Sequence, residues 1–264
     1  MTDHVLVVRA SVAPLLAAPR VSSEQVSQAL AGTALESVEH DGRWHRARTP
    51  DGYEGWMHEG YATWLSRADV ARRYDNARTS LGCTVRRADG TRMALPVGAR
   101  VANDDLVEAG VALTPVQMRT RFPANAMRVA ATAAVLFEGT TYEWGGTTPW
   151  GADCSGMVQT VFAMHGIALP RDASQQALAG TAVPLGRATL RPGDLLFFAE
   201  RGDGRVTHVG IAASATRMIH VALGRGGFAV DDLAAVGDPY VRALADTWCA
   251  TRRIDGASQN ASAQ

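Results

Sequence analysis

Short extended runs separated by turn signals characterise the first part of the chain. Four runs are apolar or alternate between apolar and polar positions, and they span 5–10, 34–39, 44–49 and 55–58. Asp41-Gly42 and Asp51-Gly52 interrupt them. An Asp-Gly pair between two extended runs is a strong hairpin signal, because both residues tolerate the left-handed backbone of a tight turn. The pattern predicts a small antiparallel β unit over residues 1–66.

A second β pattern follows at 83–101, where Asp89-Gly90 again marks a hairpin. An apolar helical pattern at 125–137 comes next, so we place a domain boundary near residue 122. The tail at 257–264 consists of small and polar residues, and we expect it to be disordered.

A helical period begins after Asp153. Apolar residues recur at helical spacing up to Gly166, which is placed to end the helix. Asp153 is a good N-cap and puts Cys154 in the first turn, where backbone N–H groups have no intrahelical partner. Because the positive end of a helix dipole favours anions, we expect a lowered pKa and a reactive thiolate at Cys154.

Three strand-like runs, at 193–198, 207–212 and 217–222, predict successive antiparallel strands. With a period of two, His208 and His220 fall on one face. A lone Cys or strand His is more often a packing residue, but a helix-start Cys followed by two strand histidines is hard to obtain from packing needs. The set predicts a cysteine nucleophile with His208 as general base and His220 orienting it.

The composition of the chain limits the kinds of partner that it is expected to bind. The chain has 264 residues, 26 basic and 26 acidic, and no net charge, so nothing indicates a nucleic-acid partner. No run approaches the roughly 20 apolar residues that a membrane span needs. The first ten residues lack a basic segment followed by a long apolar run, and we expect a cytoplasmic protein.

The cysteines are odd in number and widely spaced, at 83, 154 and 249. This spacing argues against a disulfide framework and against paired-Cys zinc ligation. We expect Cys83 and Cys249 to be buried structural thiols, and no metal or organic cofactor.

Residues 142–223 closely resemble the NlpC/P60 cell-wall peptidases. The matching segments are 142–146, 153–156, 166–171, 190–198 and 208–211. The resemblance implies a papain-like α+β core in which Cys154 is the nucleophile, His208 the base and His220 the orienting residue. It also implies a murein peptide substrate, cleaved at the γ-D-glutamyl to diamino acid bond.

Residues 38–57 resemble bacterial SH3 domains. The implied fold class is therefore α+β, with two small SH3-like β-barrel domains at 1–66 and 67–122 before a catalytic domain at 123–256. We expect Trp44 and Trp56 to pack in the core of the first barrel.

This domain order resembles a cytoplasmic peptide-recycling subgroup of the family. In that subgroup the first SH3-like domain closes the cleft, and acidic and Tyr groups hold the free amine of the substrate. The positions that carry over as substrate contacts are Glu59, Tyr61, Tyr142, Asp153, Ser155 and Ser174. Of these, Glu59, Tyr61 and Asp153 correspond to amine recognition, and Tyr142 to stabilisation of the oxyanion. Ser174 matches a cleft position but equally suits the N-cap of a helix.

Two other functions remain open from the sequence. The chain could be an adaptor that captures wall fragments on its SH3-like domains with an inactive core, although the complete set of Cys154, His208 and His220 weighs against this. It could also be a thiol acyltransferase or amidase, which would use the same three residues on another acyl donor.

Overall fold

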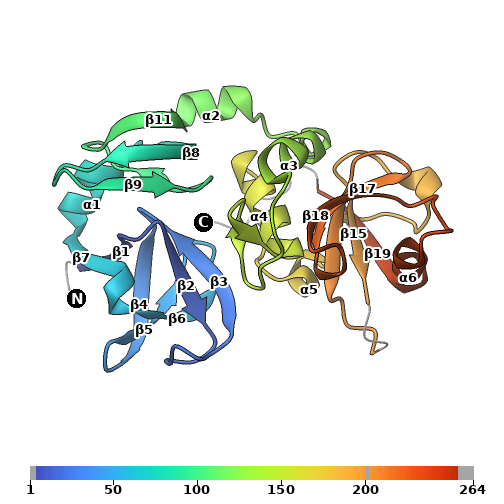
Figure 1. The fold of residues 1–264 in the computed structure, drawn as a ribbon, viewed down its shortest axis with the longest axis horizontal. Coiled ribbons are helices and arrows are strands. Elements are labelled where there is room, and N and C mark those ends of the chain that lie inside the picture. Colours follow the sequence, from blue (N-terminus) through green and yellow to red (C-terminus); the bar gives the residue numbers. More distant parts are fainter. Residues whose placement is uncertain (1–3, 200–202, 255–264) are drawn as a thin grey trace. The chain divides into compact units, whose positions relative to one another are not determined.

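The computed structural model describes residues 4–199 and 203–254 and divides the chain into two compact units, Met1–Arg121 and Phe122–Gln264 (Figure 1). Each unit has its own hydrophobic cores. The tail expected to be disordered, 257–264, lies outside the described residues.

A seven-stranded sheet forms the larger part of the first unit, in the order β3-β2-β6-β5-β4-β1-β7. Its strands are β1 (His4–Val8), β2 (Val12–Leu16), β3 (Gln25–Leu30), β4 (Ala34–Asp41), β5 (Trp44–Arg48), β6 (Glu54–His58) and β7 (Ala62–Ser66). Strand β5 pairs antiparallel with β4 and with β6, so both predicted Asp-Gly hairpins are confirmed. Strands β2, β3 and β7 were not predicted from the sequence.

The core of this sheet is aliphatic. Leu6, Leu15, Leu35 and Met57 are almost completely buried, whereas Trp44 and Trp56 are only half-buried. The expectation that the two tryptophans fill the core is wrong. Successive side chains of a strand point to opposite faces, so the inward position of Met57 turns its neighbour Trp56 outward.

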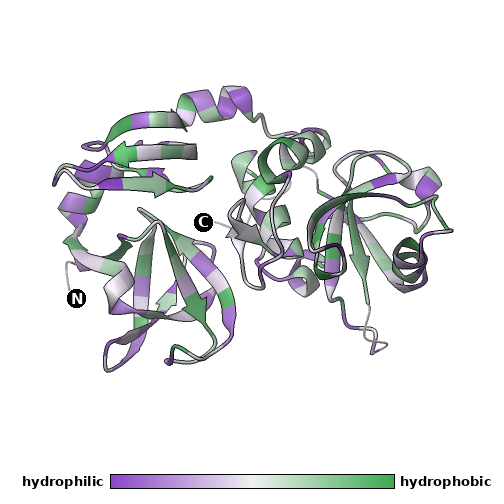
Figure 2. Cartoon of the chain, in the orientation of Figure 1, coloured by the Kyte–Doolittle hydropathy of each residue, from purple (hydrophilic) through white to green (hydrophobic). Residues whose placement is uncertain are grey.

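The second β region of this unit is a four-stranded arrangement in which β8 pairs with β9, β10 and β11. Its elements are α1 (Arg67–Tyr74), β8 (Arg78–Arg86), β9 (Arg92–Leu95), β10 (Arg100–Val101), β11 (Leu106–Leu113) and α2 (Pro115–Arg121). The hairpin predicted at Asp89-Gly90 is confirmed. Figure 2 shows that α2 is largely hydrophilic, in line with its lack of buried residues.

The two β regions share a core. Ala31, which follows β3, packs with Cys83 and Val85 of β8, and the Arg100 amide donates to the Ala31 carbonyl at 2.9 Å. They therefore belong to one compact unit, and a second, independent SH3-like barrel is not confirmed.

The second unit combines a six-stranded antiparallel sheet, ordered β14-β19-β15-β16-β17-β18, with helices on both of its faces. Its helices are η2 (Ala126–Arg128), α3 (Val129–Phe137), α4 (Cys154–Met164), α5 (Ala173–Gln176), η3 (Arg187–Thr189), η4 (Leu223–Arg225) and α6 (Pro239–Thr247). Its strands are β12 (Thr147–Thr148), β13 (Gly151–Ala152), β14 (Thr181–Ala182), β15 (Leu195–Phe198), β16 (His208–Ala212), β17 (Arg217–Ala222), β18 (Gly227–Asp232) and β19 (Trp248–Arg253). The helix predicted at 125–137 is confirmed as η2 and α3.

Alternate residues of β15 divide between two cores. Leu195 and Phe197 pack with α3 and α4, whereas Leu196 and Phe198 pack with residues that include Leu244 of α6. Figure 1 shows α3 and α4 on one side of this sheet and α6 on the other. The central strands are thus buried on both faces, and β16 packs against α4. None of the helices in the described part of the chain is long and apolar enough to span a bilayer.

Candidate active site

The nucleophile helix begins as the sequence predicts. Asp153 is the N-cap of α4, and its Oδ1 atom accepts from the Gly156 amide at 2.7 Å. Cys154, the first helical residue, is buried with 7% of its surface exposed. The backbone N–H of Val209 donates to its sulfur. This contact holds the thiol beside strand β16, next to the residue that follows His208.

The Asp153 carboxylate is engaged by further internal donors. Arg171 donates to both of its oxygens, at 2.6 and 3.1 Å, and the Gly145 amide donates to Oδ2 at 2.9 Å. Arg171 is only 2% exposed, so this is a buried, two-pronged ion pair. Asp153, predicted to bind the substrate amine, is thereby occupied in fixing the start of α4.

Arg171 is a residue to which the sequence analysis assigned no role. It lies within the Leu169-Pro170-Arg171 segment that carries the family resemblance. A basic residue inside an otherwise apolar, buried segment was the available signal, because such a charge needs a buried partner.

The predicted substrate contacts of this unit have different surroundings. Ser155 is buried; its hydroxyl donates to Asp153 at 3.2 Å and accepts from Arg171 at 2.8 Å. Tyr142 is half-buried against the core that contains Cys154 and forms a β-bridge with Ala152. Ser174 lies inside the four-residue helix α5, whose N-cap is Asp172, so the capping interpretation of Ser174 is wrong.

The two strand histidines are joined as predicted. Nε2 of His208 lies 2.8 Å from Nδ1 of His220, and the ring centroids are 5.0 Å apart. Both rings are buried, and His220 is completely inaccessible. Adjacent antiparallel strands β16 and β17 hold the pair.

The histidine pair continues into an acidic residue that the sequence analysis missed. Nε2 of His220 lies 2.8 Å from Oδ2 of Asp231 on β18, the neighbouring strand. We call His208, His220 and Asp231 the relay. A carboxylate in a strand of the predicted catalytic domain was the only sequence signal for Asp231, and no motif distinguishes it from its neighbour Asp232.

Burial sets the protonation states of the nucleophile and the base. Burial, and next to it the Asp153 charge, raises the pKa of the Cys154 thiol to about 12, against smaller opposing effects of the Val209 amide and Arg171. Burial, followed by the nearby His220, lowers the pKa of His208 to about 3. The expectation that the helix start lowers the thiol pKa is therefore wrong for the resting site, because desolvation outweighs the dipole. The resting pair is a neutral thiol and a neutral imidazole, and the imidazole is free to act as a base.

The other two cysteines are free thiols. Cys83 is buried as expected, but Cys249 is exposed on β19, so the expectation of a second buried structural thiol is wrong. Its sulfur lies 3.4 Å from the Phe197 carbonyl oxygen.

Glu59 and Tyr61 belong to the first unit, in the 3-10 turn η1 (Glu59–Tyr61) between β6 and β7. Oε1 of Glu59 lies 2.6 Å from Nε of Arg43, in an exposed ion pair. The Tyr61 side chain is exposed and its carbonyl accepts from the Arg9 amide. Their predicted part in amine recognition stays a prediction.

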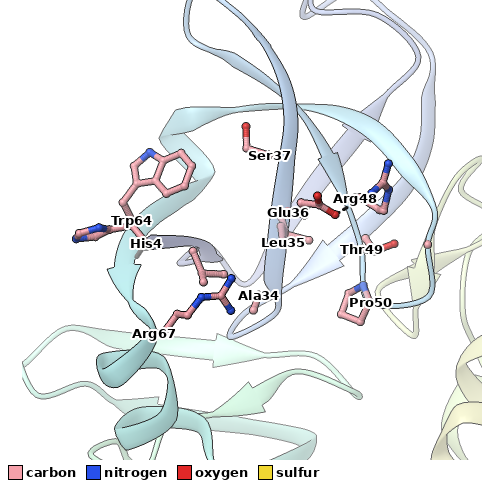
Figure 3. Close-up of a pocket in the computed structure, with 12 residues that line it drawn as sticks. His4, Ala34, Leu35, Glu36, Ser37, Arg48, Thr49, Pro50, Trp64 and Arg67 are labelled. Atoms are coloured by element: carbon pink, nitrogen blue, oxygen red, sulfur yellow. Dashed lines mark hydrogen bonds and ion pairs between the residues drawn. The ribbon is translucent and has the colours of Figure 1, made fainter. Parts of the chain in front are cut away.

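A cavity of about 810 Å³ is lined entirely by residues of the first unit (Figure 3). Glu36 and Arg48, which form an ion pair at 2.8 Å, line it together with Trp64 and Arg67. Its lining comes from β1, β4, β5 and β7 and the segments beside them, so it holds none of the relay residues.

Comparison with protein families identifies the unit that contains Cys154. The NlpC/P60 family matches residues 139–241, which include Cys154, His208, His220 and Asp231. The chain carries an NlpC/P60 domain. The bacterial SH3 domain family matches residues 11–63, within the first sheet, so an SH3-like domain precedes the NlpC/P60 domain.

Two relatives of this chain are named γ-D-glutamyl-L-lysine dipeptidyl-peptidases. The Bacillus subtilis protein is 40% identical over 119 residues, which cover 45% of this chain and 38% of the relative. The Bacillus cereus protein is 30% identical over 230 residues, which cover 74% of this chain and 66% of the relative. The chain thus spans less than two thirds of the length of these relatives.

A solved structure shares the fold. The crystal structure of an NlpC/P60 family protein from Bacillus cereus superposes with a TM-score of 0.77 at 21% identity, covering 96% of this chain and 99% of that one. At this identity the likeness establishes the fold, which is the mixed α and β arrangement with an SH3-like N-terminal part that the sequence predicts.

Proposed function

We propose that the protein is a cysteine peptidase that hydrolyses the γ-D-glutamyl to diamino acid bond of free-amine peptidoglycan stem peptides. The observation that carries the proposal is the placement of the Cys154 sulfur on the amide of Val209, the residue that follows His208, together with the hydrogen bond between the His208 and His220 rings. A nucleophile, a base and a group that orients the base are the three parts of a thiol hydrolase.

The first half-reaction forms a thioester. As the Cys154 sulfur attacks the γ-glutamyl carbonyl, its proton passes to His208 and the carbonyl oxygen gains negative charge. The carbon–nitrogen bond then breaks, and the diamino acid leaves with the proton from His208. Because the resting thiol and imidazole are both neutral, proton transfer accompanies the attack and no ion pair precedes it.

The second half-reaction restores the enzyme. His208 takes a proton from water, the oxygen attacks the thioester carbon, and the carbon–sulfur bond breaks. The proton returns to the Cys154 sulfur, and the dipeptide leaves with a new carboxyl group that then loses its proton to water. No redox or metal step is required.

The developing oxyanion needs donors near the nucleophile. The backbone N–H of Cys154 lies in the first turn of α4, where amides have no intrahelical partner, and is the first donor in this proposal. Tyr142, packed against the same core, is the second. Ser155 and Ser174 take part in the surrounding cleft, Ser155 by positioning Arg171.

The substrate class comes from the relatives. Both Bacillus proteins are named for the γ-D-glutamyl-L-lysine bond, and we extend that bond type to this chain, with lysine or diaminopimelate as the diamino acid. We place the reaction in the cytoplasm, in the recycling of soluble stem peptides.

A requirement for a free amine completes the proposal. A buried ammonium needs a charged or hydrogen-bonding partner. Glu59 and Tyr61 are the partners we propose, because their side chains are accessible, whereas the Asp153 carboxylate is buried and accepts from Arg171, Gly145 and Gly156.

Mass spectrometry of defined peptides tests the proposal. L-Ala-γ-D-Glu-meso-diaminopimelate, its lysine counterpart and their N-acetylated forms are each incubated with wild type, Cys154→Ala and Cys249→Ala. We expect wild type and Cys249→Ala to release L-Ala-γ-D-Glu from the free-amine peptides alone, and Cys154→Ala to release nothing. Glu59→Gln and Tyr61→Phe should raise KM for the free-amine peptides.

Other outcomes of this experiment would distinguish the alternative functions from one another. Cleavage of the acetylated peptides at the same rate would keep the peptidase and remove the amine requirement. A thioester or a transfer product to an added amine, without hydrolysis, would favour an acyltransferase. Binding of the peptides without any turnover would favour the adaptor.

A further inference from the structure

The relay does not end at Asp231. Arg225 of η4 donates to both Asp231 oxygens, to Oδ1 at 2.7 Å and to Oδ2 at 3.3 Å. The same guanidinium reaches Oδ2 of Asp238, the N-cap of α6, at 2.5 Å. We call Arg225, Asp231 and Asp238 the clamp.

Tyr240, the second residue of α6, lies against both His220 and Arg225. Its ring lies 6.0 Å from that of His220, and the Arg225 guanidinium carbon lies 4.4 Å from its centroid. The guanidinium cation is favoured over the aromatic face. Strand β18 and the start of α6 therefore contact His220, and η4 reaches it through Asp231 and Tyr240.

We propose that the clamp is a positioning device that fixes the tautomers of His220 and His208, so that the base presented to Cys154 is Nδ1 of His208. This inference rests on the proposed function, because it assigns Asp231 and Arg225 a role in the same reaction. Neither residue touches the reacting atoms, and both act through His220.

The tautomers follow from the order of donors and acceptors. A carboxylate only accepts hydrogen bonds, so Nε2 of His220 must carry a proton toward Asp231. In a neutral imidazole the other nitrogen is then an acceptor, and Nδ1 of His220 accepts from Nε2–H of His208. Nδ1 of His208 is left with the free lone pair that can take the thiol proton.

Arg225 keeps Asp231 in the state that this order needs. Burial opposes ionisation of Asp231, but hydrogen bonds from His220 and Arg225 together lower the pKa of its carboxyl. With Asp238, the clamp carries two negative charges and one positive charge. The residual negative charge beside His220 favours the imidazolium that forms on His208 during attack.

Replacing Asp231 by Asn makes the tautomer experimentally accessible. The Arg225 guanidinium offers only donors. The side-chain amide introduced at position 231 should therefore turn its oxygen toward Nη2 of Arg225, which makes the shorter of the two contacts. The NH2 group then faces Nε2 of His220 and forces that nitrogen to accept. His220 takes up the Nδ1–H tautomer. Its Nδ1 then donates to Nε2 of His208, so the donor and acceptor of that hydrogen bond are exchanged.

Removing Arg225 should release the amide. In Asp231→Asn/Arg225→Ala the guanidinium no longer fixes the Asn oxygen, so this oxygen can turn to accept from Nε2 of His220. We therefore expect the double variant to be more active than Asp231→Asn alone. A purely structural role for the clamp predicts the opposite, because the double variant loses more contacts.

The experiment measures tautomers and turnover in the full chain. Nitrogen-15 NMR of histidine-labelled protein distinguishes Nδ1–H from Nε2–H in the seven histidines, with His208→Gln and His220→Gln for assignment. We expect Nε2–H at both relay histidines in wild type and Nδ1–H at His220 in Asp231→Asn. By analogy with the wrong-tautomer variant of a serine-protease triad, kcat for the free-amine peptide should fall by about 100-fold or more at unchanged KM.

The matched control is Asp232→Asn, which removes the same charge at the exposed neighbour on β18 and should leave tautomers and kcat unchanged. Unaltered tautomers in Asp231→Asn, or a double variant no more active than that single variant, would overturn the clamp. The NMR readout needs no substrate, so a wild type with the expected tautomers but no peptidase activity would count against the proposed function alone.

Discussion

The Asp153 carboxylate and the Arg171 guanidinium form a two-pronged ion pair at 2.6 and 3.1 Å beneath the first turn of the nucleophile helix. The same carboxylate caps α4 through the Gly156 amide. The orientation of Cys154 therefore depends on an arginine seventeen positions further along the chain.

Arg171→Met should strongly destabilise the second unit. It removes the cation but leaves Asp153 buried, and breaking a buried pair in this way costs about 3–5 kcal/mol. Hydrogen exchange of amides in α4 and β16 measures the loss in the full chain. The control Arg217→Met changes an exposed arginine on β17 and should stay within about 0.5 kcal/mol. A loss below about 1 kcal/mol for Arg171→Met would mean that the Asp153 carboxylate is solvated or protonated without its partner.

Alkylation of Cys154 should show no thiolate plateau near neutral pH. Burial raises its thiol pKa to about 12, so the rate of iodoacetamide modification should keep rising between about pH 6 and 9. Peptide mapping by mass spectrometry gives the rate at Cys154, with the exposed Cys249 in the same sample as the internal control. A rate at Cys154 that is independent of pH in this range would show a preformed thiolate–imidazolium pair and contradict the neutral resting site.

His208 should make the second unit sensitive to acid. Burial lowers its pKa from 6.5 to about 3, so the unfolded chain binds the extra proton between these values. The contribution of His208 to stability is then complete above pH 6.5 and is lost as the pH falls toward 3. At about 1.4 kcal/mol per pH unit, about 2 kcal/mol should be gone at about pH 5.

Denaturant unfolding between about pH 5 and 8 measures this effect. His208→Gln should flatten the profile, whereas His40→Gln, an exposed histidine of the first unit, serves as the matched control. Equal slopes for wild type and His208→Gln would mean that the ring is protonated in the folded protein.

Local patterns in the sequence were sufficient for much of this site. The Asp153 cap, the helix that starts at Cys154 and the pairing of His208 with His220 depend on residues close in sequence or on adjacent strands. These features follow from capping chemistry and from the periods of helix and strand. They were therefore predictable without tertiary information.

Features that depend on packing were not predictable in this way. Asp231 and its neighbour Asp232 look alike in the sequence, and only the register of β18 against β17 places one of them next to His220. The pKa of Cys154 is raised because α3, α4 and the sheet together bury its thiol, whereas the sequence shows only that Cys154 lies at a helix end. Cys249 is exposed because of the register of β19, which its apolar neighbours do not reveal.

Gly156→Ala tests how tightly the nucleophile loop fits the helix start. A Cβ atom at residue 156 would lie 2.0 Å from the Gly146 carbonyl oxygen, which accepts from the Asp153 amide at 3.1 Å. The added methyl group must push that backbone aside, so we expect a loss of about 1–3 kcal/mol together with a lower kcat. Thermal unfolding and peptide turnover are measured on the same samples.

The matched control for this substitution is Gly237→Ala. A Cβ atom at Gly237 meets no heavy atom within 4 Å, and we expect a change of less than about 0.5 kcal/mol with unchanged turnover. If Gly156→Ala lowers stability but leaves kcat intact, the loop moves without displacing Cys154, and the loop carbonyl is only a packing contact. If it lowers kcat more than stability accounts for, contact between the Gly146 carbonyl and the first turn of α4 holds the nucleophile in place for attack.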